Sequence, residues 1–101
     1  MWLFVFFDLP TTTKTERRHA SLFRKGLEKD GFTMMQYSVY TRHCASRESI
    51  EVHIKRVHKS LPPSGLVSIL SVTDKQFGDI VNYWGKIEQK RIDMPQQLEF
   101  F

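Results

Sequence analysis

A carboxylate at the end of an apolar run is the first residue whose type and position could support chemistry. Residues 2–7 are all apolar or aromatic, Asp8 follows them, and Pro10 comes two positions later. Trp, Phe and Val favour the half-buried surface of a strand, and proline fits poorly in a continuing strand. The pattern predicts a buried strand that delivers Asp8 to the end of a sheet, where a carboxylate can be hydrated, paired or bound to a metal.

Magnesium is the metal that such a carboxylate suits. Mg²⁺ keeps several waters and binds proteins through one or two carboxylates together with phosphate oxygens. A two-fold axis duplicates every group of an interface, so two copies of Asp8 could share one Mg²⁺ and place a metal-bound water against a phosphodiester. The competing interpretation of Asp8 is a surface acid beside a turn.

A row of cations is the second feature with chemical consequences. Residues 14–30 are expected to be helical, with Ala20, Phe23 and Leu27 as the buried stripe. At about 100° per residue, four cations fall within an arc of about 60°, nearly opposite that stripe. They are Lys14, Arg18, Lys25 and Lys29, flanked by Arg17 and Arg24. Lys and Arg neutralise phosphates, so the row is a candidate surface for a nucleic-acid backbone; the alternative is a solvated helix face.

Other chemistries lack the residue spacings that they need. The four histidines (His19, His43, His53 and His58) include no i, i+4 pair, and Cys44 is the only cysteine. Neither a zinc site nor an intrachain disulfide is therefore expected. The five glycines stand singly, which excludes a glycine-rich phosphate loop. We interpret the histidines as helix-flank and strand-end residues.

The size and charge of the chain indicate one basic domain. Its 101 residues carry a formal charge of +4 and a pI of about 9.4, which suits a polyanionic partner. The beginning of the chain has no basic stretch before its apolar run and no small-residue cleavage site, unlike a signal peptide. The apolar run is far shorter than the ~20 residues that span a bilayer. We expect a cytoplasmic protein that contacts no membrane.

The first elements that must position these residues carry clear signals. Thr13 and Glu16 form a capping-box pattern at the start of the helix, and Gly31 ends it. Residues 32–44 favour strand but exceed the usual length of about 5–6 residues, which predicts a hairpin near residues 36–38. Ser46 caps a second helix, for which the expected apolar stripe is Ile50, Ile54, Val57 and Leu61.

The later elements complete a β-α-β-β-α-β order. Residues 66–72 read as a strand, residues 73–78 as a turn or one helical turn, and residues 80–84 as a last short strand closed by Gly85. The expected division is a domain over residues 1–85 and a tail over residues 86–101, with the apolar end of the tail docking on a second subunit.

This order predicts an α+β, ferredoxin-like fold with an additional C-terminal strand. Both helices would lie on one face of the sheet and leave an aromatic-rich face bare. Exposed apolar surface of that extent marks an interaction site. We therefore expect a symmetric homodimer packed sheet to sheet.

Four stretches carry a resemblance to a known family. They are the apolar strand that ends in Asp8, the helix with Arg17-Arg18, Gly31 followed by Gln-Tyr-Ser-Val-Tyr at residues 36–40, and Asn-Tyr-Trp-Gly at residues 82–85. Over residues 2–85 the chain resembles the small, second CRISPR-associated (Cas) protein, which partners the CRISPR integrase during spacer acquisition.

The resemblance implies a dimeric protein of CRISPR adaptation that binds the backbone of duplex DNA and bridges integrase dimers. It implies that Asp8 is the catalytic acid and the ligand for Mg²⁺, or another divalent cation, in members described as metal-dependent endonucleases. Whether this chain is such an enzyme stays open, as does its preference for DNA or RNA. The resemblance gives a backbone-binding role to Arg17 and Arg18, whereas Lys14, Lys25 and Lys29 depend on the helical arc. Members often have Tyr before the acid, where this chain has Phe7.

Two alternatives remain open. A stand-alone Mg²⁺-dependent endoribonuclease related to ribonuclease toxins would share this fold. An RNA recognition module without catalysis would share the element order, and residues 3–10 resemble its first RNA-contact strand. The second motif of such modules, rich in glycine and aromatic residues, is missing. A regulatory domain for a small molecule ranks last, because residues 11–13 do not resemble the glycine-flanked loop of acylphosphatase.

Overall fold

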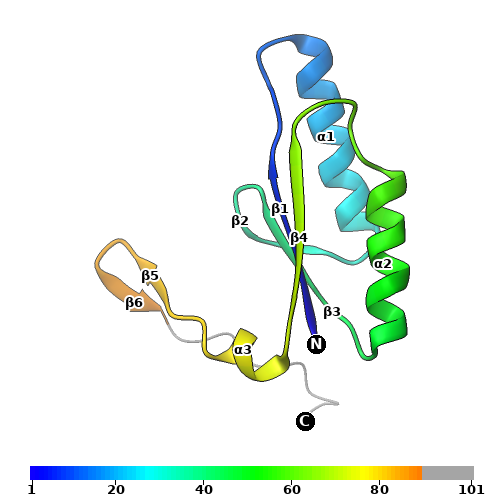
Figure 1. The fold of residues 1–101 in the computed structure, drawn as a ribbon. Helices are drawn as coiled ribbons and strands as arrows, with labels where there is room; N and C mark the ends of the chain where they lie inside the picture. The colour runs from blue at the N-terminus through cyan, green and yellow to red at the C-terminus, as the bar shows by residue number, and fades with distance from the viewer. Residues whose placement is uncertain (90–101) are drawn as a thin grey trace.

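The computed structural model describes residues 1–89, which form an α+β fold (Figure 1). Its elements are β1 (Trp2–Asp8), α1 (Lys14–Lys29), β2 (Thr33–Gln36), β3 (Val39–His43), α2 (Arg47–Lys59), β4 (Leu66–Val72), α3 (Asp74–Gly78), β5 (Asn82–Trp84) and β6 (Ile87–Gln89). Strands β2-β3-β1-β4 make one antiparallel sheet in that order. The arrangement confirms the expected ferredoxin-like fold. None of the helices within residues 1–89 has the length and apolar character to cross a bilayer.

The two faces of the central strand β1 pack against different elements. Leu3, Val5 and Phe7 are buried in the main core with residues of α1 and α2. Trp2 and Phe4 point to the opposite face and cluster with α3, because successive side chains of a strand alternate between faces. We call this second side of the main sheet the open face, since α1 and α2 both lie on the other side (Figure 1).

The predicted local signals are present in the structure. Thr13 and Glu16 form a capping box at the start of α1, and the Ser46 hydroxyl accepts a hydrogen bond at the start of α2. Gly31 follows α1 with φ of 91°, a conformation that favours glycine, and the Arg42 guanidinium fills the space that a side chain would need. The expected hairpin turns at residues 37–38 between β2 and β3.

The end of the described chain differs from expectation. The last predicted strand begins at residue 82 rather than 80, and it pairs with β6, which the sequence did not predict. Gly85, with φ of 65°, lies in a two-residue turn between the two strands instead of closing the domain. The expected boundary at residue 85 thus falls inside a hairpin. The rest of the expected tail, residues 90–101, lies outside the described residues.

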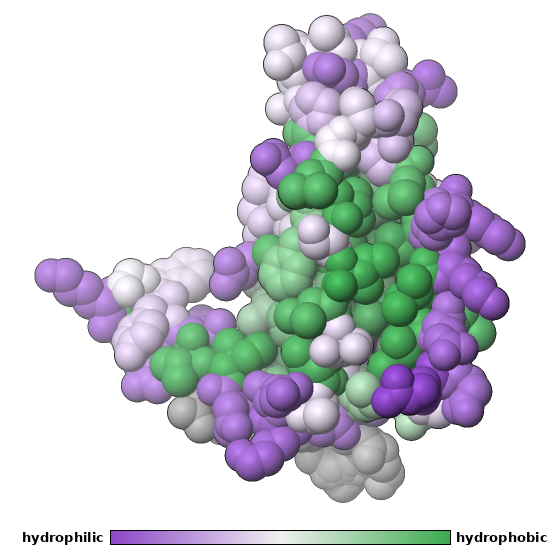
Figure 2. Space-filling model, viewed as in Figure 1, coloured by the Kyte–Doolittle hydropathy of each residue, from purple (hydrophilic) through white to green (hydrophobic). Residues whose placement is uncertain are grey.

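The open face carries exposed apolar side chains, as the sequence predicts. Figure 2 shows a continuous apolar patch over this side of the sheet. Its exposed members include Phe6 of β1 and two residues of β4, Leu66 and Leu70, which are 67% and 50% exposed. The separate β5–β6 hairpin adds exposed Tyr83 and Trp84. Apolar surface of this extent marks an interaction site.

Candidate functional site

Asp8 lies at the end of β1 with an exposed side chain, opposite Leu66 of β4. It shares the open face with Phe6, since the two are two positions apart in one strand. A hollow of about 270 Å³ lies beside it, lined also by Tyr37 and Ser68. The sequence therefore predicted the position of Asp8 correctly: a carboxylate at a strand end, facing solvent.

The backbone beneath Asp8 is held on both sides. The Phe7 N–H donates a hydrogen bond of 3.1 Å to the Ser38 carbonyl, in the turn between β2 and β3. Gly65, just before β4, has φ of 102°, and a Cβ there would lie 2.9 Å from the Asp8 carbonyl oxygen. Only glycine fits this close approach without displacing Asp8. Nothing near Gly65 in the sequence indicates this packing role.

The residue before the acid faces away from it. Phe7 is buried, with its ring 5.2 Å from that of Phe23 in edge-on contact and 5.7 Å from that of Tyr40. A tyrosine hydroxyl at this position would therefore extend into the helix side of the sheet. The change from Tyr to Phe is a change in the core, and it removes no group from the Asp8 side of the sheet.

One chain supplies only part of a magnesium site. The exposed carboxylate of Asp8 has the oxygen ligands that Mg²⁺ prefers. Within residues 1–89, however, no three His, Cys, Asp or Glu side chains come together as a metal-binding group. The residues therefore fit Mg²⁺ only if water, phosphate oxygens or a second copy of Asp8 completes the coordination.

The cation row of α1 is exposed along the whole helix. Its members are Lys14, Arg18, Lys25 and Lys29, all exposed, while Ala20, Phe23 and Leu27 are buried on the opposite side. At about 1.5 Å per residue the row is roughly 22 Å long. Helix α1 begins only six residues after Asp8. Its first turn, where the row starts, therefore lies toward the end of the sheet that carries this acid (Figure 1).

The two neighbouring arginines of α1 differ in their contacts. Arg17 donates hydrogen bonds of 3.1 and 3.0 Å to the carbonyls of Thr11 and Thr12, and so braces the loop that joins β1 to α1. The side chain of Arg18 makes no hydrogen bond or ion pair with any other residue in the described part of the chain. Both are exposed, so Arg18 is available to a phosphate, while Arg17 also fixes the loop.

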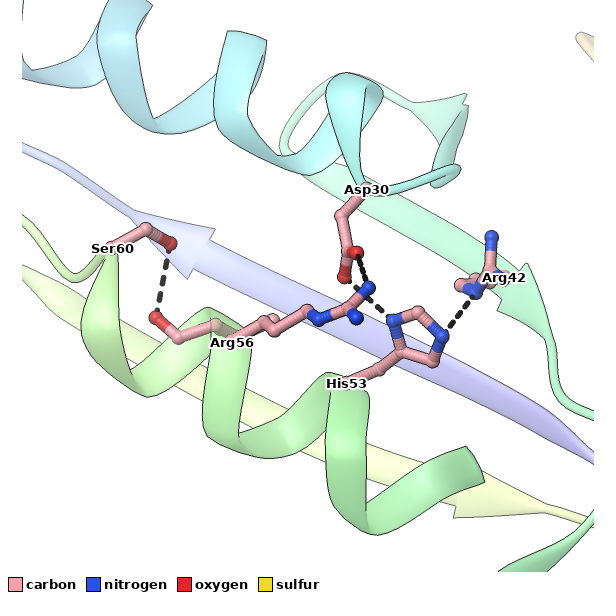
Figure 3. A network of polar contacts seen from close by, with 6 residues as sticks. Asp30, Arg42, His53, Arg56 and Ser60 are labelled. Atoms are coloured by element: carbon pink, nitrogen blue, oxygen red, sulfur yellow. Dashed lines mark hydrogen bonds and ion pairs between the residues drawn. The ribbon is translucent and has the colours of Figure 1, made fainter. Parts of the chain in front are cut away.

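A buried histidine, which the sequence did not single out, joins α1, β3 and α2 (Figure 3). His53 Nε2 accepts a hydrogen bond of 3.0 Å from Arg42, so its Nδ1 carries the proton and donates to Asp30 at 2.7 Å. Arg56 binds the second oxygen of Asp30 at 2.8 Å. The expectation of a helix-flank histidine is wrong here: His53 faces the core, and Ile54, from the expected stripe, is 37% exposed.

The network also sets the ionisation of its carboxylate. Burial alone would raise the pKa of Asp30, but the hydrogen bonds from His53 and Arg56, together with the positive charge of Arg56, outweigh burial and hold that pKa below its usual value. Asp30 is therefore ionised at neutral pH and fully engaged. A helix position three residues after Ile50 and four before Val57 was the signal that could have placed His53 in the core.

The stretch at residues 36–40, which contributes to the family resemblance, ends in a buried tyrosine. Tyr40 is 2% exposed, and its hydroxyl donates to the Glu28 carboxylate at 3.3 Å. Burial, with the nearby charge of Glu28, raises the pKa of the Tyr40 hydroxyl above its usual value. Glu28 is thus held by Tyr40 and lies outside the arc of the cation row.

Comparison with known proteins agrees with the geometry. A family model described as "CRISPR associated protein Cas2" matches residues 1–80. The chain is 52% identical to the CRISPR-associated endoribonuclease Cas2 of Flavobacterium psychrophilum, over all of this chain and 88% of that protein. It is also 52% identical to the protein of that name from Parvibaculum lavamentivorans, over the full length of both, and 40% identical to that of Paracidovorax avenae, over 100% and 94%. The chain therefore belongs to the Cas2 family of CRISPR-associated proteins.

Proposed function

We propose that this chain acts in CRISPR spacer acquisition as a homodimeric adaptor that binds the backbone of duplex DNA and bridges integrase dimers. The observation that carries the proposal is the exposed cation row of α1. Within the described residues none of its four members is engaged in an ion pair. Membership of the Cas2 family supports the same role.

The row suits a phosphate backbone better than a specific base sequence. Four cations over roughly 22 Å cover a large part of one helical turn of DNA, which is about 34 Å. Contacts from Lys and Arg to phosphates fix the position of a protein on the duplex but carry no sequence information. A protein that must hold many different DNA fragments needs this kind of binding.

The open face supports a dimer that leaves α1 accessible. A second copy that covered Phe6, Leu66 and Leu70 would remove exposed apolar surface from water, which is favourable at about 25 cal/mol per Å². The β5–β6 hairpin would gain as well, since a two-stranded hairpin alone is marginal in water. Because α1 and α2 lie on the other side of the sheet (Figure 1), both copies of the cation row would face outward.

Salt dependence of binding tests the duplex-binding part. We would measure the affinity for a duplex of about 30 base pairs over a salt series, for the natural chain and for Arg18→Ala, Lys25→Ala and Lys29→Ala. Each lost phosphate contact lowers the salt slope by about 0.9. Arg47→Ala, at the first turn of α2, removes one exposed charge outside the row and is the matched control. A slope that none of the row variants changes would contradict the proposal.

Bridging needs a separate experiment. The chain would be mixed with the CRISPR integrase subunit from the same source, and complex formation and DNA integration measured with and without it. The proposal expects that integration of a duplex requires this chain. Leu70→Glu, on the open face, should prevent the dimer and should therefore fail to support integration. Integration at full rate without the chain would exclude the adaptor role.

A second candidate function is a metal-dependent endonuclease that uses Asp8 of both subunits. The exposed carboxylate on the open face favours it, because a symmetric dimer through that face duplicates Asp8 across the interface. Relatives that carry the name endoribonuclease support it. Mg²⁺ bound there would neutralise phosphate charge and orient a water molecule. The held backbone of Asp8 would fix the position of this ligand.

Cleavage assays decide this second function. RNA and duplex DNA would be incubated with the natural chain and with Asp8→Asn, each with and without a chelator. Loss of cleavage in both the variant and the chelated sample is expected. Cleavage that persists in Asp8→Asn would assign the activity to another site or a contaminant. A working integration complex built with Asp8→Asn would show that the adaptor role does not need this activity.

A further inference from the structure

We propose that the groove between α1 and α2 binds an acidic segment of a partner protein, one that also carries apolar side chains. The groove is on the helix side of the main sheet, away from the open face (Figure 1). The inference is therefore independent of the proposed dimer and of the Asp8 site, and the groove shares only Lys29 with the cation row.

The groove consists of two hollows that meet at one residue. They measure about 310 and 260 Å³, and Ser60, which caps the end of α2, lines both. Leu27 and Val57 are buried at the base of the first hollow, and Leu22 and Leu61, in the second, are 54% and 42% exposed. An apolar base beside exposed leucines can receive apolar side chains of a partner.

A glycine that packing does not require opens the first hollow. Gly26 lies inside α1, where glycine costs about 0.5–1 kcal/mol relative to alanine. Its backbone has no positive φ, and a Cβ there would meet only Ser60, at an ordinary 3.9 Å. An alanine would therefore fit and would stabilise the helix. Choices of residue that break a local rule without a structural need are found mainly at functional sites.

The positive charge of the two helices favours a partner of negative charge. Helices α1 and α2 contain ten Lys and Arg residues against four Glu, more than the net +4 of the whole chain. Lys29 and Arg56 line the first hollow, and the one carboxylate there, Asp30, is already bound by Arg56 and His53 (Figure 3). Arg56 is engaged in the same ion pair, so Lys29 is the one Lys or Arg among the described lining residues that has no ion-pair partner. The groove thus has a net positive charge and no free acid among its lining residues.

These two properties together favour a peptide over a nucleic acid. A net positive charge attracts either partner, but an apolar base gains nothing from a hydrated phosphate backbone, and a duplex is too broad to enter a groove between two packed helices. A peptide with acidic residues and Leu- or Phe-sized side chains matches both, and peptides commonly dock their apolar side chains in grooves between helices.

The experiment uses a fluorescent peptide that alternates glutamate and leucine, with a lysine–leucine peptide and a DNA duplex as comparisons, on the full chain. Binding is measured by anisotropy, and its location by amide chemical shifts. Gly26→Leu places a side chain in the groove and should lower the affinity for the acidic peptide at least about tenfold. Thr15→Leu adds the same side chain to an exposed position in the first turn of α1 and should leave affinity unchanged. Lys29→Gln should weaken binding about threefold and lower its salt dependence.

The shifted amides should include Gly26, Ser60 and Leu61. Equal affinity of Gly26→Leu and the natural chain, or shifts confined to the cation row, would overturn the proposal. Duplex binding that Gly26→Leu abolishes would assign the groove to nucleic acid and also overturn it. Should Gly26→Leu not fold, Gly26→Ala provides the readout. It should raise the stability of the chain and weaken its binding to the acidic peptide. A Gly26→Ala chain that is more stable but binds the peptide as well as the natural chain would contradict the proposal.

Discussion

The imidazole Nδ1 of His53 lies 2.7 Å from the Oδ2 atom of Asp30, which links the middle of α2 to the residue that caps α1. The same imidazole accepts from Arg42 of β3. Three elements that are distant in sequence therefore meet at one buried imidazole. A buried polar network of this kind is stabilising only while each member keeps its partners.

Asp30→Asn should destabilise the fold at neutral pH by about 1–3 kcal/mol, because it leaves the His53 N–H and Arg56 without a charged acceptor. The pKa of Asp30 is lower in the folded chain than the value of about 3.9 expected when unfolded. The ionised carboxylate therefore stabilises the fold above about pH 4, and this contribution is lost as the pH falls through the lower, folded pKa.

Urea unfolding at several values between pH 7 and pH 3 measures this effect. The difference between the natural chain and Asp30→Asn should be largest at pH 7 and should shrink toward pH 3. Glu51→Gln removes an exposed carboxylate of α2 and serves as the control, with little change expected at any pH. A difference that stays constant with pH would show that the charge of Asp30 does not stabilise the fold.

Gly31→Ala should destabilise the chain more than Gly85→Ala does. Both glycines have a positive φ, of 91° and 65°, so each alanine adopts a conformation that costs about 1–2 kcal/mol. At Gly31 the new Cβ would also collide with the Arg42 guanidinium, whereas at Gly85 no atom lies within 4 Å. The free energies of unfolding, from urea titrations of both variants, check the difference. Equal losses would mean that Arg42 moves aside at no cost.

Leu70→Glu should convert a dimer into a folded monomer. Leu70 is 50% exposed in the middle of β4 on the open face, and a charge there would have to be buried in a sheet-to-sheet interface. Val52→Glu, at a position 45% exposed on α2, introduces the same charge on the helix side and should leave the dimer intact. Light scattering after gel filtration gives the mass of each. A monomeric natural chain, or a dimeric Leu70→Glu, would remove the support for the open face as the interface.

Asp8→Asn should change the free energy of unfolding by no more than about 0.5 kcal/mol, as for other exposed substitutions away from special contacts. Thermal unfolding of the two proteins provides the measurement. With stability unchanged, any loss of cleavage in this variant reports on the chemistry of the carboxylate. A large loss of stability would instead reveal a structural role for the Asp8 side chain.

The parts of the fold that the sequence predicts are those set by local physical signals. The capping box of Thr13 and Glu16, the glycine after α1 and the apolar run before Asp8 each specify an element through residues that are close in the chain. The same is true of the exposed cation row, since helical spacing alone determines which side chains point away from the buried stripe.

The features that the sequence did not predict depend on distant partners. Hydropathy alone placed Ile54 in the core and His53 outside, because nothing near His53 in the chain shows that Asp30 and Arg42 will satisfy both of its ring nitrogens. Gly85 was interpreted as the end of a domain because Ile87–Gln89 is too short to read as a strand before Asn82–Trp84 is known to pair with it.

Alternation along β1 has a consequence for how tolerance to mutation should be distributed. Neighbouring positions of this strand are under different constraints. Leu3, Val5 and Phe7 are needed for a single molecule to fold, whereas Phe6 and Asp8 face outward. A screen that scores only whether the isolated chain folds would report the outward positions as freely exchangeable. Residues that a sheet-to-sheet dimer would cover, such as Phe6 and Asp8, would then appear as the least constrained of the strand.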